Sequence, residues 1–452
     1  MSAQSGNTVR LAVERMTYGA DAIAHNEDGK TIFVEGAVAG DVVEARIVRD
    51  EKSFSRAIAV SVLEPSPQRI SPTCPFAGVC GGCPWSTLAY DAQLEAKRAN
   101  VMDALVRIGH MEQTRAEELV APCEAPGKPW GYRNKIELAF AKQGSRAIVG
   151  MHAAAHEGTK KPQVIKVDSC PLLSTRHKKL VKAVSGALGY LTGSHGITLD
   201  RVGIRASERT KDVEIALWTS PGSFPRSQAA KILTDATKAS SIVRVLTKGP
   251  TKARKVTGVE VLKGRGHWRE RLYNNTMMLS APSFFQVNTV GAQRLIDLVL
   301  EGLSPTEDDE AMDLYCGAGT FTLPLAEKCA WVSAVESYGP AVRDLRRNLD
   351  SCGLNNVEPI GGDADREFPD GQADVIVVDP PRAGLAPDVI RKLSEQPARA
   401  IAYVSCDPAT LARDLRRFAN EGVFQPVSIT PVDLFPQTYH VETVVLMSKV
   451  KE

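Results

Sequence analysis

The last third of the chain carries the pattern that most restricts its fold, a regular alternation of short apolar runs and amphipathic segments. The apolar runs predict strands at 311–314, 331–336, 374–378, 399–404 and 441–448. The amphipathic segments predict helices at 339–352, 386–395 and 408–421. Such alternation is typical of a doubly wound, mostly parallel sheet. We therefore expect a Rossmann-like α/β domain over 276–452, with its ligands beyond the carboxyl ends of the strands.

Two different regions precede this domain. Short alternating runs at 9–13, 31–34, 42–47 and 57–60 predict a small, OB-like β-barrel over 1–65. A linker rich in proline and serine follows it, and then an amphipathic helix from about Tyr90 to Gly109. The remainder of 66–275 mixes strands and helices, which predicts a central α+β domain.

Charge is distributed very unevenly among these regions. The net charge of the whole chain is +2, but residues 1–65 carry −3, residues 66–275 carry +16 and residues 276–452 carry −11. A domain at +16 suits a polyanion, because neutralised phosphates release their counterions. The central region therefore predicts binding to nucleic acid, whereas the acidic barrel contributes less to it.

The first strand of the last domain leads into a turn that fits a nucleoside cofactor. Residues 313–319 read DLYCGAG, and Gly317 and Gly319 allow a tight turn close to a ligand. Glu336 ends the next strand, where a carboxylate can accept both ribose hydroxyls, and Asp363 follows the third strand, where it can meet an adenine amino group. The chain lacks the third glycine of a dinucleotide turn, since position 322 is Thr. S-adenosylmethionine, which has no pyrophosphate, fits best.

Two further loops of this domain carry candidate catalytic groups. Asp379 begins the loop Asp379–Arg382, whose two prolines hold it rigid beside the cofactor. Amino-group methylases use a similar Asp-Pro-Pro loop followed by an aromatic residue, a place taken here by Arg382. Cys406 follows the strand at 399–404 and precedes a helix, whose N-terminus favours a thiolate. Other cysteines of this domain lack that context and are interpreted as structural.

A thiolate is useful to a methylase when the target is a pyrimidine carbon. Carbon 5 of uracil is a poor nucleophile until a thiolate adds to carbon 6 and makes carbon 5 an enolate carbon. A base must then remove the proton from carbon 5. Glu442, which starts the last strand, is our candidate for this base, and His440 is the alternative.

Four cysteines outside this domain have the spacing of a soft-metal site. Cys74, Cys80 and Cys83 form a C-x5-C-x2-C motif, and Cys170 lies far downstream. Zinc ribbons favour paired C-x2-C units, whereas three close thiols plus a remote one are common for cubane clusters. The pattern therefore predicts a [4Fe–4S] cluster, and four cysteine ligands favour a structural or RNA-docking role.

Together these motifs resemble the TRAM-domain, iron–sulfur-containing class of RNA uracil-C5 methyltransferases, over nearly the whole chain. The family's nucleophile motif maps onto Ser405–Asp414, which implies that Cys406 is the nucleophile, and its terminal His-x-Glu-Thr strand implies that Glu442 is the base. Residues 284–288 match its Phe-x-Gln-x-Asn element, which implies a cofactor or base contact for Gln286. The resemblance also implies cofactor roles for Tyr315, Thr320, Glu336, Asp363 and Asp379, and cluster ligation by Cys74, Cys80, Cys83 and Cys170.

The sequence departs from this family at two of these places. Asp407 stands where many members have Asn, and Thr320 where some have Asn. Bacterial members that modify the tRNA T-loop often lack both barrel and cluster, so their presence here points by analogy to 23S ribosomal RNA as the substrate, with tRNA as the alternative.

Three other functions are less consistent with these residues. A cytosine-C5 methyltransferase would place a cysteine in the loop Asp379–Arg382, which has none. A radical enzyme of the methylthiolation type would use three cysteines spaced C-x3-C-x2-C, unlike the four found here. A non-enzymatic RNA-binding protein has no need of Cys406, Glu442 and Asp379 together. No bilayer-length apolar run or signal peptide is evident, so we expect a cytoplasmic monomer without a membrane or obligate protein partner.

Overall fold

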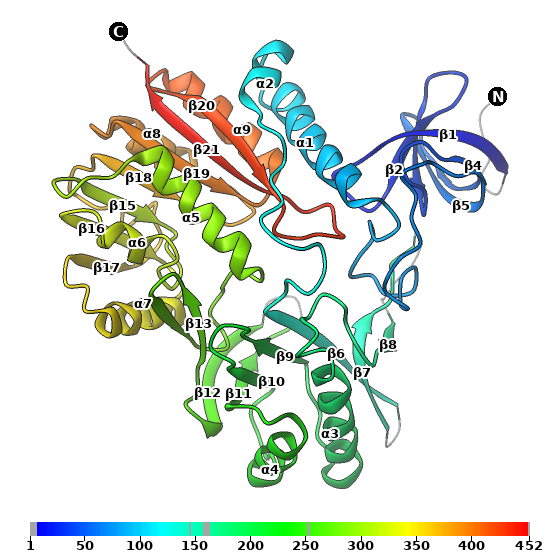
Figure 1. Cartoon of the computed structure of the whole chain (residues 1–452), viewed down its shortest axis with the longest axis horizontal. Coiled ribbons are helices and arrows are strands. Elements are labelled where there is room, and N and C mark those ends of the chain that lie inside the picture. The colour runs from blue at the N-terminus through cyan, green and yellow to red at the C-terminus, as the bar shows by residue number, and fades with distance from the viewer. Residues whose placement is uncertain (1–6, 144–145, 157–162, 251–253, 451–452) are drawn as a thin grey trace.

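A computed structural model describes residues 7–143, 146–156, 163–250 and 254–450 (Figure 1). Within them the strands form a closed barrel, two seven-stranded sheets and a two-stranded hairpin. Figure 1 shows the barrel, the central sheet and the C-terminal sheet as three separate bodies, with helix α1 lying between the barrel and the C-terminal sheet. No helix in these described ranges is long and apolar enough to cross a membrane.

The N-terminal barrel closes in the strand order β1-β2-β3-β5-β4. Its strands are β1 (Thr8–Met16), β2 (Ala22–His25), β3 (Thr31–Glu35), β4 (Val42–Asp50) and β5 (Phe54–Glu64). Inward side chains alternate with outward ones on β4, where Val43, Ala45 and Ile47 are buried. The predicted barrel is confirmed. The sequence did not predict β2, because Ala22, Ile23 and Ala24 are all buried and give no alternating pattern.

The central sheet is mostly antiparallel, with the order β12-β11-β10-β9-β6-β7-β8 and one parallel pair, β10 with β11. Its strands are β6 (Lys135–Gln143), β7 (Arg146–His152), β8 (Val164–Lys166), β9 (Arg201–Ala206), β10 (Val213–Thr219), β11 (Ser241–Lys248) and β12 (Lys255–Gly264). Helices α3 (Leu180–His195) and α4 (Arg226–Thr237) share one core with this sheet, in which Leu188 and Leu233 pack beside Ile215.

The C-terminal sheet has the order β17-β16-β15-β18-β19-β21-β20. Its strands are β15 (Glu310–Leu314), β16 (Trp331–Glu336), β17 (Val357–Gly361), β18 (Val375–Val378), β19 (Ala400–Ser405), β20 (Phe424–Val432) and β21 (Glu442–Lys449). The first five strands of that order are parallel, and β21 and β20 run antiparallel to their neighbours. The expected mostly parallel sheet is present, and β15, β16, β18 and β19 bring their carboxyl ends to one edge.

Helices cover both faces of this sheet because its strand side chains alternate between two cores. Ala311, Val375 and Val377 face the core on one side, whereas Met312 and Ile376 face the other. The helices of the first face are α5 (Thr289–Leu303), α6 (Thr322–Ala326) and α7 (Gly339–Cys352). Those of the second face are α8 (Pro387–Glu395) and α9 (Pro408–Glu421). The hairpin of β13 (Trp268–Leu272) and β14 (Asn275–Leu279) packs beside α7 and joins the first core.

The segment before the central sheet also belongs to this second layer. Helices α1 (Tyr90–Arg107) and α2 (Gln113–Leu119) pack against α9 and β20, and Val101 and Leu105 lie in the same core as Leu411. The chain then pairs with the edge strand through bridges from Val120 and Glu124 to β20. A stretch that the sequence groups with the central region thus completes the C-terminal domain.

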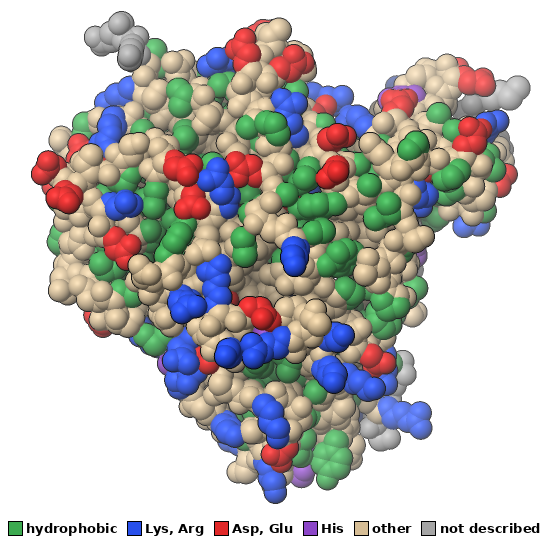
Figure 2. All heavy atoms as spheres, in the orientation of Figure 1, with side chains coloured by type: hydrophobic (Ala, Val, Ile, Leu, Met, Phe, Trp, Pro, Cys, Tyr) green, Lys and Arg blue, Asp and Glu red, His purple; other side chains and the backbone are tan. Residues whose placement is uncertain are grey.

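The charge asymmetry of the sequence is visible on the surface. On the face in Figure 2, Lys and Arg side chains gather over the central sheet and its junction with the C-terminal domain. Some arginines of the central region form ion pairs with carboxylates, as Arg265 and Arg269 do with Asp212. The basic surface in Figure 2 therefore lies over the region of residues 66–275, whose net charge is +16.

Candidate active site

One cavity of about 600 Å³ lies at the carboxyl edge of the C-terminal sheet. It is bounded by the loops after β15, β16, β18 and β19 and by the start of β21. Nearly all of the residues predicted for the site line it: Gln286, Tyr315, Gly317, Thr320, Glu336, Asp363, Asp379, Cys406 and Glu442. The sheet therefore brings together side chains that are spread over more than 150 positions of the sequence.

The turn after β15 is shaped by its glycines and by Glu336. Gly317 has φ +58° and Gly319 has φ +99°. Residues other than glycine rarely adopt positive φ angles. A side-chain carbon on Gly319 would come within 2.4 Å of Leu323, whereas one on Gly317 would meet open space. Gly319 therefore sets the turn without lining the cavity, and Gly317 leaves room for a ligand.

Glu336 fixes this turn while it faces the cavity. Its Oε2 accepts a hydrogen bond from the Gly317 amide at 2.9 Å, and its Oε1 accepts one from the Tyr338 amide at 2.5 Å. Each carboxylate oxygen retains a second lone pair that can accept from a ligand hydroxyl. This geometry suits the two hydroxyls of a ribose.

Asp379 directly follows β18 and lies inside a group of carboxylates. Burial, together with the nearby Asp313 and Glu336, raises the pKa of Asp379 to about 8. Burial and the nearby Glu336 also raise the pKa of Asp313 to about 7. The hydrogen bond that Thr322 donates to Asp313 opposes this rise. A buried carboxyl that retains its proton near neutral pH can donate a hydrogen bond as well as accept one.

Cys406 lies half-buried between β19 and α9. Asp407 caps the helix by accepting bonds from the amides of Ala409 and Thr410, both at 3.0 Å, so the acidic residue performs the task that an asparagine performs. The sequence led us to expect that this helix end would favour a thiolate. Instead, burial and then the carboxylates of Glu442 and Asp379 raise the pKa of the Cys406 thiol to about 12.

Glu442 and Gln286 each point an unpaired atom into this region. Oε2 of Glu442 and Oε1 of Gln286 are buried and have no hydrogen-bond partner in the described part of the chain. Burial and the neighbouring Asp379 raise the pKa of Glu442 well above its usual range. Buried polar groups are nearly always paired, so these two acceptors suit hydrogen bonds from a ligand in the cavity.

The alternative base, His440, lies beside the site. It does not line the cavity. Burial and the positive charge of Arg382 lower the pKa of His440 to about 4. Its ring instead packs edge-on with Phe435 at a centroid distance of 5.8 Å, so Glu442 is the better placed of the two groups.

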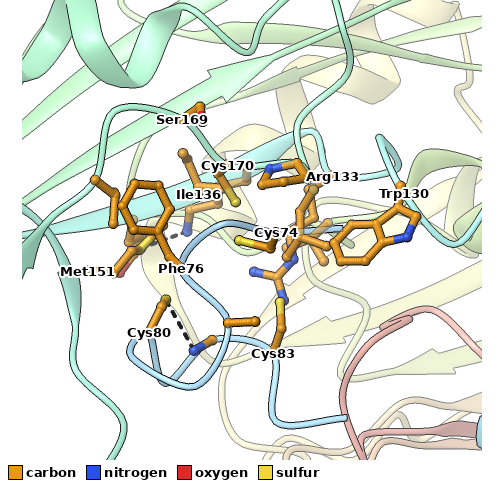
Figure 3. A pocket seen from close by; sticks show the side chains of 18 residues that line it. Cys74, Phe76, Cys80, Cys83, Trp130, Arg133, Ile136, Met151, Ser169 and Cys170 are labelled. Atoms are coloured by element: carbon orange, nitrogen blue, oxygen red, sulfur yellow. Dashed lines mark hydrogen bonds and ion pairs between the residues drawn. The ribbon is translucent and has the colours of Figure 1, made fainter. Parts of the chain in front are cut away.

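A second cavity, of about 350 Å³, is lined by all four cysteines predicted to bind metal (Figure 3). Cys74, Cys80 and Cys83 come from the loop after the barrel, and Cys170 follows β8. Figure 3 shows Arg133 extending between the cysteine side chains, and its charge opposes the rise that burial causes in the pKa of Cys83, to about 12. The structure thus brings the remote cysteine to the other three.

The four thiols are free and line one cavity. Across the ranges that the structure describes, no three cysteine, histidine or acidic side chains converge closely enough to hold one metal ion. In iron–sulfur clusters the iron is held by cysteine thiolates. Four free thiols around one mainly apolar cavity therefore have the donor chemistry that such a cluster requires.

Comparisons with known proteins match this architecture. A family model described as tRNA (uracil-5-)-methyltransferase matches residues 269–370 and 364–450, and one described as TRAM domain matches residues 3–60. An uncharacterized RNA methyltransferase of Thermosynechococcus vestitus is 31% identical over 98% of this chain and 99% of its own length. A second, from Gloeobacter violaceus, is 33% identical over 98% and 97%. The chain belongs to the tRNA (uracil-5-)-methyltransferase family.

A solved structure of this family has the same overall arrangement. The tRNA (uracil-54, C5)-methyltransferase of Pyrococcus abyssi, in complex with S-adenosyl-L-homocysteine, has a TM-score of 0.73 and 26% identity, and the match covers 97% of this chain and 99% of that one. The predicted family, the enzyme class and the TRAM barrel are thereby confirmed. The predicted cluster and the 23S rRNA preference stay predictions.

Three residues in or beside the cavity were not predicted from the sequence: Phe284, Tyr338 and Tyr18. Phe284 and Tyr338 line the cavity although both are partly exposed, and Tyr338 follows Glu336 by only two positions. Tyr18 comes from the distant barrel and donates a hydrogen bond to the carbonyl of Cys406 at 3.0 Å. The first two lie inside recognisable motifs, but no local pattern could have linked Tyr18 to a loop 388 positions away.

Proposed function

We propose that this protein transfers the methyl group of S-adenosylmethionine to carbon 5 of a uridine in RNA. The observation that carries the proposal is the single cavity that holds Cys406, Glu442 and Asp379 beside the nucleoside-binding turn of Gly317 and Glu336. The Pyrococcus relative, whose structure holds S-adenosyl-L-homocysteine and whose name specifies uracil C5, supports the same reaction and cofactor.

The residues of the cavity have separate roles in this reaction. The thiolate of Cys406 adds to carbon 6 of uracil, and carbon 5 of the resulting enolate attacks the methyl group. Glu442, as carboxylate, then removes the proton from carbon 5, and the C–S bond to Cys406 breaks to restore the ring. The unpaired Oε2 of Glu442 is available for that proton. Asp379 and Gln286 face the same space and can hydrogen-bond the edge of the base.

The cofactor supplies the electrophilic methyl group, and a separate set of side chains is placed to hold it. Glu336 accepts the ribose hydroxyls and Asp363 the adenine amino group, while the turn at Gly317 leaves space for the ligand. Tyr315 and Thr320 line the same wall. The Asp379 loop and Cys406 line the same cavity, which suits transfer of the methyl group to a base beside Cys406.

We also propose that Cys74, Cys80, Cys83 and Cys170 hold a [4Fe–4S] cluster. Soft thiolates suit iron–sulfur clusters, and the four thiols line one cavity. Arg133 and Lys135 line it as well and would offset the negative charge of such a group. With all four positions occupied by cysteine, the cluster would serve structure or RNA docking.

Two classes of RNA suit this protein. Sequence analogy favours 23S ribosomal RNA, and the positive excess of residues 66–275 suits either a ribosomal or a transfer RNA. The Pyrococcus relative, which matches this chain over 97% of its length, is named for tRNA nucleotide 54. Its full-length likeness means that the barrel alone does not distinguish the two substrates, so tRNA is the second candidate.

The function can be tested by trapping the protein on RNA that contains 5-fluorouridine. Fluorine at carbon 5 cannot leave as a proton, so an attacking thiolate stays attached after methyl transfer. We expect an adduct that requires S-adenosylmethionine, forms with wild type and with Cys352→Ala, and is absent from Cys406→Ala. Cys352 is the matched control because its thiol does not line the cavity.

Two RNA substrates should be compared in this assay, fragments of 23S rRNA and tRNA transcripts. The RNA that is trapped faster identifies the substrate class. Binding of S-adenosylmethionine should remain near normal in Cys406→Ala, which separates loss of the nucleophile from loss of the fold. An adduct that survives in Cys406→Ala, or no adduct on either RNA while the cofactor binds, would contradict the proposal.

A further inference from the structure

Tyr18 belongs to the barrel but touches both segments that supply the candidate catalytic groups. It lies in the loop between β1 and β2, and its hydroxyl donates a hydrogen bond to the main-chain carbonyl of Cys406 at 3.0 Å. Its ring packs edge-on against Tyr439, with centroids 5.6 Å apart, and against His440, at 6.5 Å. His440 precedes Glu442 by two positions, so one side chain of the barrel contacts the surroundings of both the nucleophile and the base.

The loop that carries Tyr18 is held firmly in place. The carbonyl of Gly19 accepts a hydrogen bond from the indole N–H of Trp85 at 3.0 Å, and Trp85 is completely buried. The amide of Trp85 in turn donates to the carbonyl of Gln437 at 3.1 Å, close to the last strand. The barrel loop is thus joined to the catalytic domain through a rigid aromatic side chain.

Helix α1 reinforces this junction. Gln93 and Gln437 exchange two hydrogen bonds: the amide of Gln437 donates to Oε1 of Gln93 at 2.8 Å, and Nε2 of Gln93 donates to Oε1 of Gln437 at 3.2 Å. A few residues along, Lys97 and Asp433 form an ion pair whose side chains are both fully buried. The barrel loop, α1 and the segment before β21 therefore form one connected polar network.

Side-chain hydrogen bonds hold the turn at Cys406. Ser405 Oγ contacts the amide and the carbonyl of Asp407, both at 3.2 Å, which holds the turn on one side of the cysteine. The bond from Tyr18 holds the carbonyl of Cys406 itself. Burial and the nearby Asp407 raise the pKa of Tyr18 well above its usual range, so the hydroxyl remains a donor at any working pH.

We infer that the TRAM barrel completes the active site, with Tyr18 as a positioning residue that holds the Cys406 peptide so that the thiol points at carbon 6 of the target base. This inference rests on the proposed function. It gives the barrel a role that its net charge of −3 permits, since the role needs no phosphate contact. A displacement of a reacting atom by about 1 Å can slow a reaction by about 100-fold, so one such bond can be significant.

The decisive variant is Tyr18→Phe, which keeps the ring and its packing and removes only the hydroxyl. We expect the rate of adduct formation on 5-fluorouridine RNA to fall by about tenfold and kcat to fall with it. The KM and Kd for S-adenosylmethionine and the midpoint of thermal unfolding should change little. Tyr273→Phe is the control, because its hydroxyl is also hydrogen-bonded, to the Asp297 carboxylate and within 3.0 Å of the main-chain carbonyl of Gln293, away from the cavity.

The outcomes separate this inference from the function on which it rests. If wild-type protein forms no Cys406-dependent adduct, the proposed function fails. If wild type forms the adduct and Tyr18→Phe forms it at the same rate, the positioning role is overturned. A Tyr18→Phe protein that loses cofactor affinity and thermal stability in proportion to its rate would also overturn it, because the bond would then serve stability alone.

Discussion

At the scale of single residues, the surroundings of the candidate nucleophile favour the thiol over the thiolate. Burial and the nearby carboxylates of Glu442, Asp379 and Asp407 raise the pKa of the Cys406 thiol to about 12, and Arg382 opposes them. The carboxyls share this tendency to stay protonated, since the pKa of Asp379 is raised to about 8. The side chains that line the cavity therefore disfavour negative charge. A ligand that brings a positive charge would shift these equilibria toward the thiolate.

Alkylation of Cys406 by iodoacetamide measures this directly. Because a raised pKa leaves less thiolate, we expect alkylation at pH 8 to be about 100-fold slower, or more, in the folded protein than in protein unfolded by urea. The folded rate should keep rising about tenfold per pH unit up to pH 10, whereas the unfolded rate should level off near pH 9. Peptide mapping by mass spectrometry isolates Cys406 from the other cysteines.

The same assay tests the effect of charge. The sulfonium of S-adenosylmethionine should accelerate alkylation relative to S-adenosylhomocysteine, which has nearly the same shape and shields the thiol similarly but lacks the positive charge. A folded-state rate that levels off below pH 9 would show that the thiol is not suppressed by its surroundings.

At the scale of elements, the turn between β19 and α9 fixes the position of Cys406. The cap at Asp407 supplies two hydrogen bonds to the first turn of α9. We expect Asp407→Ala to lower the free energy of unfolding by about 1 kcal/mol and to slow adduct formation, because the turn beside the nucleophile loosens. Asp407→Asn keeps the cap and should behave almost as wild type. Urea unfolding and single-turnover trapping check the two effects, and an Asn variant as impaired as Ala would contradict the capping explanation.

The elements also show what a sequence can predict. Helices 339–352 and 408–421 match α7 and α9 to the residue, because each combines a clear 3.6-residue period with a capping or proline signal. Strand β20 was missed because Pro426 and Pro431 interrupt its pattern, which an edge strand tolerates. The grouping of Cys406, Glu442 and Asp379 follows from motifs at the ends of neighbouring strands. The docking of α1 on α9 and the contact of Tyr18 depend on tertiary packing, which leaves no local pattern.

At the scale of the whole molecule, three units that differ in charge are joined by a few buried connections. The barrel reaches the catalytic sheet through Tyr18 and Trp85. The loop that carries Cys74, Cys80 and Cys83 follows the barrel and pairs with the central sheet through a bridge from Cys80 to Ala153. A cluster on these cysteines and on Cys170 would tie that loop to the central domain and so fix the position of the barrel relative to that domain's basic surface.

This arrangement predicts the effect of losing one cluster ligand. After anaerobic purification, wild-type protein should be brown and contain about four irons per chain, whereas Cys80→Ser should lose the colour and most of the iron. Its thermal unfolding midpoint should fall by several degrees, because the loop and the remote Cys170 lose their connection. Cys352→Ser is the matched control, since this half-buried thiol lies outside the cysteine cavity. Stoichiometric zinc without iron in the wild-type protein would show a zinc site in place of the cluster. A colourless wild-type protein without metal, as stable as Cys80→Ser, would show that these cysteines hold no metal.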